Sequence, residues 1–108
     1  MLFRSERLYL ATGMETLTVL AEADGRVLKT MTVMNRPERI VIDPRANRIY
    51  VANTGAGTLS VIDARSDAII AQPIVAEAMG FGLAVDSRYG RLYIVERIAI
   101  TARLRALE

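Results

Sequence analysis

The chain lacks cysteine, histidine and tryptophan altogether. Because the chain has no thiol, it cannot form disulfide bonds or use a thiol nucleophile. Without thiol and imidazole it also has no Cys/His zinc site and no catalytic triad or dyad that uses histidine as its base. The missing cysteine fits a cytosolic protein and also a protein on a bacterial exterior, so the compartment stays open.

The sequence also lacks a long hydrophobic run and a block of like charge. No segment approaches the roughly 20 apolar residues that span a membrane, and the N-terminus shows no apolar stretch followed by a small-residue cleavage site. Fourteen basic residues face 12 acidic ones, which gives a net charge of +2. The basic residues are scattered, whereas a nucleic-acid-binding surface would gather them on one face. We therefore expect neither a nucleic acid partner nor a membrane span.

A short pattern, Arg-x-Tyr followed by small or aliphatic residues, recurs three times in the chain. Its tyrosines, Tyr9, Tyr50 and Tyr93, lie 41 and 43 residues apart. The preceding segment repeats as RIVIDPRANR at 39–48 and GLAVDSRYGR at 82–91, and the following segment repeats as TLTVL at 16–20 and TLSVI at 58–62. Three elements that recur in the same order indicate an internal repeat.

Each repeated element has the features of a β-strand, because it is short, rich in β-branched or aromatic residues, and bounded by turn residues. Asp24-Gly25 predicts a two-residue type I′ hairpin turn, which needs a positive φ at both positions. The predicted strands are 7–12, 16–22 and 26–34, then 39–43, 48–53, 58–63 and 68–75, then 82–86, 91–96 and 98–104. For the tail after Glu96 we favour a strand that pairs with a neighbouring unit or chain, with a terminal helix as the competitor.

A period of about 40 residues with four strands per repeat is typical of a β-propeller blade. The predicted fold class is all-β, with four-stranded antiparallel blades in an incomplete propeller arc. A single domain, 1–108, would contain a partial blade at 7–34, a full blade at 39–75 and a partial blade at 82–104.

The segment 37–74, PERIVIDPRANRIYVANTGAGTLSVIDARSDAIIAQPI, resembles the YVTN-type β-propeller repeat. The signature is Tyr50-Val51-Ala52-Asn53, and it decays to Tyr9-Leu10-Ala11-Thr12 and Tyr93-Ile94-Val95-Glu96 in the outer units. The resemblance covers about residues 7–96. It implies blades around an axis, with 39–43 and 82–86 innermost. It also suggests an extracellular or periplasmic protein of bacterial or archaeal origin.

The number of blades is smaller than a closed propeller needs. Closed propellers have about four to eight blades, and this chain supplies about two and a half. An isolated arc would expose apolar faces and strand edges, which favour association. The expected partners are therefore the missing blades of a longer chain, or further copies assembled head to tail.

Few residues suggest chemistry. The Gly-rich NTGAGT segment, 53–58, is predicted to be a hairpin turn, because a phosphate loop would need a following helix or a Walker lysine. The strand-ending acids Asp43, Asp63 and Asp86 are predicted to cap turns. Glu96 takes the position of Asn53 where the repeat is ending, and Arg39 could line an axial channel, but its counterpart is Gly82, so there is no ring of charge. Arg97, Arg103 and Arg105 are predicted to lie on the outward face of an alternating strand, with contact to an acidic partner as the alternative. We predict no catalytic, cofactor-binding or metal-ligating residue and no cofactor.

The first hypothesis is a non-catalytic binding or scaffold module, built from YVTN-like repeats, that mediates protein or ligand recognition. The alternative is a piece of a propeller enzyme, a lactonase-like hydrolase or a dehydrogenase-like protein, with its catalytic residues in blades absent from this chain. The lack of histidine and of a convergent acidic cluster favours the first interpretation over the second.

Overall fold

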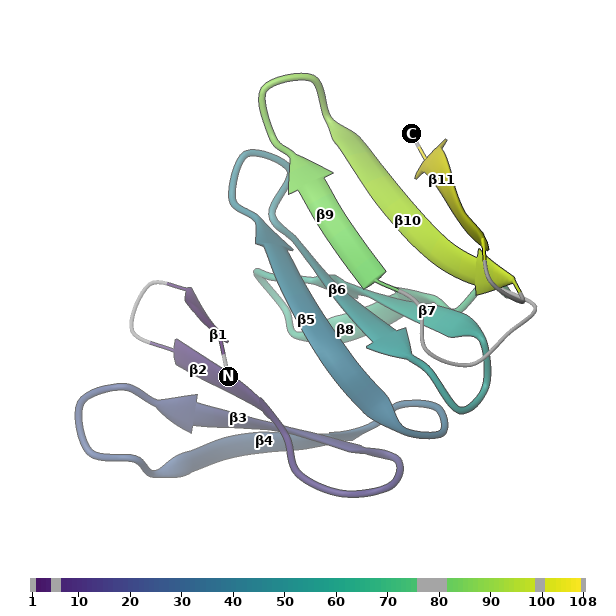
Figure 1. Ribbon diagram of the computed structural model, residues 1–108. Coiled ribbons are helices and arrows are strands. Elements are labelled where there is room, and N and C mark those ends of the chain that lie inside the picture. Colours follow the sequence, from purple (N-terminus) through teal and green to yellow (C-terminus); the bar gives the residue numbers. More distant parts are fainter. Residues whose placement is uncertain (1, 5–6, 76–81, 99–100, 108) are drawn as a thin grey trace.

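The computed structural model describes residues 2–4, 7–75, 82–98 and 101–107, and every regular element within them is a β-strand. The strands form three antiparallel sheets (Figure 1). This arrangement confirms the all-β, antiparallel class predicted from the strand pattern. No helix in the same residues is long and apolar enough to cross a membrane.

The strands of each sheet are consecutive in the chain. The first sheet contains β1 (Leu2–Arg4), β2 (Arg7–Ala11), β3 (Thr16–Ala21) and β4 (Val27–Thr32). The central sheet contains β5 (Pro37–Asp43), β6 (Arg48–Asn53), β7 (Thr58–Asp63) and β8 (Ala68–Ala71). The third sheet contains β9 (Gly82–Asp86), β10 (Arg91–Ile98) and β11 (Thr101–Leu107). Each strand pairs with the next one along the chain, so every connection within a sheet is a hairpin.

The three tyrosines of the Arg-x-Tyr pattern occupy the same place in the three sheets. Each lies on the second strand and pairs with one residue on the first strand and one on the third. These partners are Leu2 and Val19 for Tyr9, Val41 and Val61 for Tyr50, and Ala84 and Ala106 for Tyr93. The spacing of the tyrosines in the sequence therefore corresponds to one sheet.

The sheets stand next to one another through their first strands. β5 contacts β1 on one side and β9 on the other (Figure 1). The second and third strands of each sheet follow outward from these first strands. The central sheet is thus flanked on both of its faces.

Three strand predictions differ from the structure. The first sheet has an additional strand, β1, which is only three residues long and is too short to show a periodic pattern. The predicted strand 68–75 ends at Ala71, and Pro73 follows, which has no N–H to continue the ladder. The tail is not one strand over 98–104, because β10 continues to Ile98 and β11 pairs back on it from Thr101. That strand therefore pairs within its own sheet.

Four hairpin turns of the described residues share one backbone feature. In the four-residue turns 44–47, 54–57, 64–67 and 87–90, the last residue has a positive φ; these residues are Asn47, Gly57, Asp67 and Gly90. The prediction for Asp24-Gly25 is wrong, because β3 and β4 are joined by residues 22–26, and only Gly25 has a positive φ, 73°. A longer loop needs one left-handed residue where a type I′ turn needs two.

Apolar side chains form two buried clusters, one on each face of the central sheet. The cluster shared with the first sheet contains Tyr9, Leu17, Val19, Met31, Val33, Ile49, Val51, Ile62 and Ala64. The cluster shared with the third sheet contains Ala52, Leu59, Val75, Leu92 and Ile94, with Val41, Tyr50, Val61, Leu83 and Val85 packed against it. A buried aliphatic side chain contributes about 1.5–3 kcal/mol and a surface ion pair about 0–1 kcal/mol. Packing between sheets therefore dominates the stability.

Gly90 tests the backbone requirement at the ends of the turns. Its φ is 65°, and an added Cβ would meet no atom within 4 Å, so a substitution there changes conformation without a clash. We expect Gly90→Ala to lower the free energy of unfolding by about 1 kcal/mol, and Gly90→Asn to lower it by clearly less, because asparagine tolerates the left-handed region. Urea denaturation measures both. An equal loss in the two variants would contradict this explanation.

Candidate functional site

Buried polar side chains gather in the central sheet and its turns. Those among the described residues are Asp43, Asn53, Thr54, Thr58, Ser60 and Asp67. A polar group that is removed from water without a hydrogen-bond partner destabilises the folded state by about 1–3 kcal/mol. The partners of these side chains therefore show which contacts the fold maintains in its interior.

Asp67 joins the central sheet to the first sheet, and we call this set of contacts the Asp67 tie. The carboxylate forms an ion pair with the guanidinium of Arg7 and accepts a hydrogen bond of 2.9 Å from the Tyr9 hydroxyl. The Lys29 ammonium donates to the Asp67 backbone carbonyl at 2.8 Å. Three side chains from the first sheet thus converge on one turn residue, which is only 5% exposed.

The backbone at Asp67 matches this role. Asp67 ends the turn 64–67 with a φ of 57°, a conformation that aspartate and asparagine adopt more readily than most residues. The turn is closed by a hydrogen bond of 2.8 Å from the Asp67 N–H to the Asp63 carbonyl. A glycine would satisfy the backbone equally well, but it would supply no carboxylate for Arg7 and Tyr9.

Asp43 makes the corresponding connection to the third sheet. Its Oδ1 accepts hydrogen bonds from the backbone N–H groups of Arg45 at 3.2 Å and Ala46 at 3.3 Å, and also from the Ser87 hydroxyl. The Arg45 guanidinium adds a hydrogen bond of 3.4 Å to the Arg88 carbonyl. These polar contacts therefore join the turn 44–47 of the central sheet to the turn 87–90 of the third sheet.

The environment of Tyr50 follows from the same arrangement. Burial against the third sheet raises the pKa of the Tyr50 hydroxyl, and the negative charge of Asp43 raises this pKa further. The guanidinium of Arg48 opposes the shift. The neutral phenol is therefore the form that the folded protein favours.

The NTGAGT segment uses its polar groups to close its own hairpin. The Asn53 amide donates to the Thr58 hydroxyl at 3.2 Å and to the Ser60 hydroxyl at 2.9 Å, and Ser60 donates to the Gln72 side-chain oxygen at 2.6 Å. Asn53 is fully buried, and its Oδ1 has no partner among the described residues. These contacts tie β6 to β7 and β7 to the segment after β8.

The same segment also fastens the connection between the first and central sheets. The Thr54 hydroxyl donates to the Arg36 carbonyl at 3.2 Å and also contacts the Glu38 carboxylate, a contact that lowers the pKa of Glu38. A Cβ on Gly55 would lie 2.9 Å from the Asn35 amide nitrogen. Gly55 therefore permits a close approach of the connecting segment. These contacts support the predicted interpretation of the segment as a turn.

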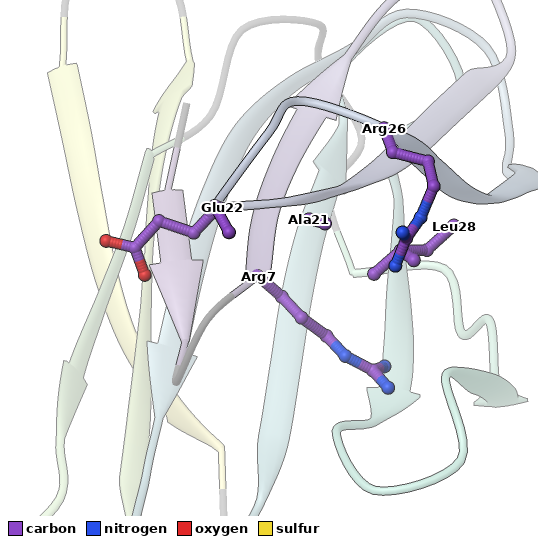
Figure 2. A pocket seen from close by; sticks show the side chains of 6 residues that line it. Arg7, Ala21, Glu22, Arg26 and Leu28 are labelled. Carbon is purple, nitrogen blue, oxygen red and sulfur yellow. The ribbon is translucent and has the colours of Figure 1, made fainter.

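An open pocket of about 630 Å³ lies at the turn between β3 and β4. Its lining consists of Arg7, Ala21, Glu22, Ala23, Arg26 and Leu28. Figure 2 shows the Glu22 carboxylate directed away from the Arg7 and Arg26 side chains. Arg7 is paired with Asp67, and Arg26 lies 3.6 Å from the Asp24 carboxylate. The two cations that line the pocket, Arg7 and Arg26, therefore already have anionic partners. The pocket thus does not present an acid–base pair.

The acids singled out in the sequence cap separate turns, as predicted. Asp43, Asp63 and Asp86 each accept a hydrogen bond from the backbone N–H two residues later, at 3.2, 3.2 and 3.1 Å. At Asp63 this backbone bond and the Ser66 hydroxyl lower the pKa. The described residues contain no group of three or more acidic side chains placed to hold a metal ion.

Arg39 lies on a different sheet from the other candidates, whereas Glu96 and Arg103 are register partners on neighbouring strands. Arg39 is exposed on β5. Glu96 and Arg97 lie on β10, and Arg103 and Arg105 lie on β11, with side chains outside the described set. Sequence reasoning did not identify Asp67. The only signal for it was its place at the end of a turn, because its partners lie 58 and 60 residues away.

The Asp67 tie predicts a graded loss of stability. Asp67→Ala removes the carboxylate and leaves Tyr9 and Arg7 without their acceptor, so we expect the free energy of unfolding to fall by about 3 kcal/mol. Asp67→Asn keeps an oxygen for Tyr9 and tolerates the positive φ, so we expect a loss of about 1 kcal/mol. Chemical denaturation measures both. Asp24→Asn, at an exposed ion pair, is the control and should change stability by less than about 0.5 kcal/mol. Equal losses in Asp67→Ala and Asp24→Asn would contradict the tie.

Tyr50 predicts a dependence of stability on alkaline pH. Because the pKa of Tyr50 is raised in the folded protein, its contribution is fully present below the unfolded value of about 10 and is lost as the pH rises through the folded pKa. The difference in phenolate absorbance between the wild type and Tyr50→Phe should give a midpoint above pH 10. Wild-type stability should also fall more steeply than that of Tyr50→Phe above this pH. A midpoint at or below 10 would rule this out.

No protein-family model matches the chain, and a search of curated proteins finds no similar sequence.

Proposed function

We propose that the chain is a non-catalytic scaffold and recognition module whose sheets are blades of a β-propeller. The observation that carries this proposal is that both interfaces between sheets are built in the same way. In each, the face that bears the tyrosine of one sheet packs on the aliphatic face of the next. Tyr9 lies against Ile49 and Val51, and Tyr50 lies against Leu92 and Ile94.

Two further features support blades of a propeller. The first strands of the sheets, β1, β5 and β9, lie side by side (Figure 1), as the inner strands of blades do around an axis. Each sheet is a simple succession of hairpins, which is the topology of a blade. The resemblance of residues 37–74 to the YVTN-type repeat agrees with both features.

The polar contacts favour a scaffold over an enzyme. The carboxylates of Asp43 and Asp67 are both engaged in contacts between sheets, and the polar groups of Asn53 close a hairpin. These side chains stabilise the fold, and they do not converge on a cavity. Binding surfaces on such a frame belong on exposed turn positions that take no part in the contacts between sheets.

The turn 87–90 offers the best recognition surface in the described part of the chain. Tyr89 is 66% exposed, and the guanidinium groups of Arg88 and Arg91 each lie 6.0 Å from the centre of its ring. Exposed tyrosine and arginine side chains dominate binding energy at protein interfaces. We therefore assign recognition of a protein partner to this turn.

Substitution of Tyr89 tests whether this side chain serves binding or folding. We expect Tyr89→Ser to leave the free energy of unfolding within about 0.5 kcal/mol of the wild-type value, because the ring is exposed. Tyr9→Phe, which removes a buried hydroxyl from the Asp67 tie, is the matched control and should lose about 1 kcal/mol. A larger loss in Tyr89→Ser than in Tyr9→Phe would mean that Tyr89 is structural, and it would remove the recognition surface.

A hydrolysis assay tests the non-catalytic part of the proposal. With a panel of lactones and divalent metal ions, the chain should give the same rate as buffer. Hydrolysis that increases in proportion to the concentration of the chain, and that is abolished by thermal unfolding, would overturn the scaffold role.

A further inference from the structure

Each outer sheet has one face that no other described element covers. On the first sheet this face carries Leu8, Leu10 and Leu20, and Val27 lies across from Leu20. On β2, Leu8 and Leu10 alternate with Tyr9, which faces the central sheet, so both leucines point the other way. Both leucines are partly exposed, and Val27 is 59% exposed. We call this surface the leucine face.

The other two sheets show what normally happens at the positions of the leucine face. The residues that flank Tyr50 are Ile49 and Val51, and both are fully buried against the first sheet. The residues that flank Tyr93 are Leu92 and Ile94, and they are 4% and 0% exposed against the central sheet. Wherever another sheet is present, these positions are buried. The leucine face therefore corresponds to the buried aliphatic faces of the other two sheets, but no described sheet covers it.

The third sheet has the opposite kind of open face. Tyr93 and Val95 lie on the side of β10 away from the central sheet, opposite Ala84 and Gly82 of β9. Val95 is 40% exposed, whereas Ala52, its counterpart on β6, is fully buried. Of the two counterparts of Tyr93, Tyr9 is fully buried, whereas Tyr50 is partly buried, as Tyr93 itself is. We call this surface the tyrosine face.

We propose that the leucine face of one copy of this chain binds the tyrosine face of a second copy, head to tail. The two open surfaces are a matched pair, because a tyrosine face packed on an aliphatic face forms both interfaces within the chain. A second copy therefore supplies the surface that each face lacks, in a contact whose chemistry the chain already uses twice. Such a contact is heterologous, and it closes into a ring when the rotation between sheets allows.

The number of sheets selects a closed dimer. Propellers close with about four to eight blades. The described residues of one copy form three sheets, so two copies supply six and three copies supply nine, which exceeds the usual range. In a two-fold ring of six sheets, both open faces of each copy are covered by the same interface formed twice. This inference rests on the proposed function, because it requires the sheets to be blades.

The test begins with the wild-type chain. Sedimentation velocity and light scattering over a range of micromolar concentrations should give twice the mass of one chain, with no larger species. A monomer throughout the range would overturn the proposal, and so would a mass that keeps growing with concentration, as an open filament would. A third arm, an excess of a longer chain that carries further blades, should not displace the second copy; displacement would identify the missing blades as the true occupant and overturn the proposal.

Two single-face variants test the pairing of the faces. Leu10→Arg places a charge on the leucine face, Val95→Arg places one on the tyrosine face, and each variant alone should sediment as a monomer. Mixed in equal amounts, they should form a heterodimer, because one intact interface remains between the unmodified faces. Ile70→Arg, at a 52% exposed position on β8 of the central sheet, is the matched control and should remain dimeric.

Variants that remain monomeric after mixing contradict the pairing of the two faces and overturn the proposal. Dimers that persist in both single variants place the interface elsewhere and overturn the proposal. Dimers that persist in only one variant indicate a symmetrical contact of one face with itself, which also overturns it. If circular dichroism shows that an arginine variant does not fold, Leu10→Ser and Val95→Ser replace the pair with the same expected outcomes. A monomeric wild type would leave the scaffold role standing, because Tyr89→Ser and the hydrolysis assay test that role separately.

Discussion

The structure depends on one constraint, which is that the central sheet is apolar on both faces. Along β6, Ile49, Tyr50, Val51 and Ala52 are consecutive, so neighbouring residues bring apolar groups to opposite sides. An antiparallel sheet with one face in water would instead alternate apolar and polar residues. A sheet of this kind cannot be stable alone in water, and it needs a neighbour on each side. The first and third sheets cover these two faces. Each of them in turn has an outer face with apolar residues that no described element covers.

Polar contacts determine how each sheet is placed on its neighbour. Apolar burial stabilises any arrangement that removes area from water, so by itself it does not fix how one sheet is placed on the next. The Asp67 tie and the contact of Asp43 with Ser87 each join a turn of the central sheet to a different neighbour. Because an unpaired buried carboxylate is costly, a shifted arrangement of the sheets would be destabilised. The two aspartates thereby select one register at each interface.

The sequence was most informative where the local signal is strong. The strands 48–53 and 58–63 agree with β6 and β7, because a run of β-formers on each side of a Gly-containing turn leaves few alternatives. The short strand β1 and the reversal before Thr101 were missed, since neither carries a turn residue such as glycine, proline, asparagine or aspartate. Asp67 was missed for a different reason. Its function depends on residues about 60 positions away, and spacing along a chain does not show which sheet stands beside which.

Substitutions on the packed faces and substitutions at exposed turn positions have different effects on this chain. A substitution on a face alters contacts that two sheets share, so it affects folding and, in the proposed ring, assembly together. A substitution of Tyr89 alters neither, because its exposed side chain takes no part in the contacts of Ser87 and Arg88 that join this turn to the central sheet. Specificity for a partner can therefore vary at exposed turn positions such as Tyr89, while the turn residues that join the sheets stay constant. This physical independence is what makes a scaffold role coherent with the contacts of Asp43, Asn53 and Asp67, all of which are directed inward.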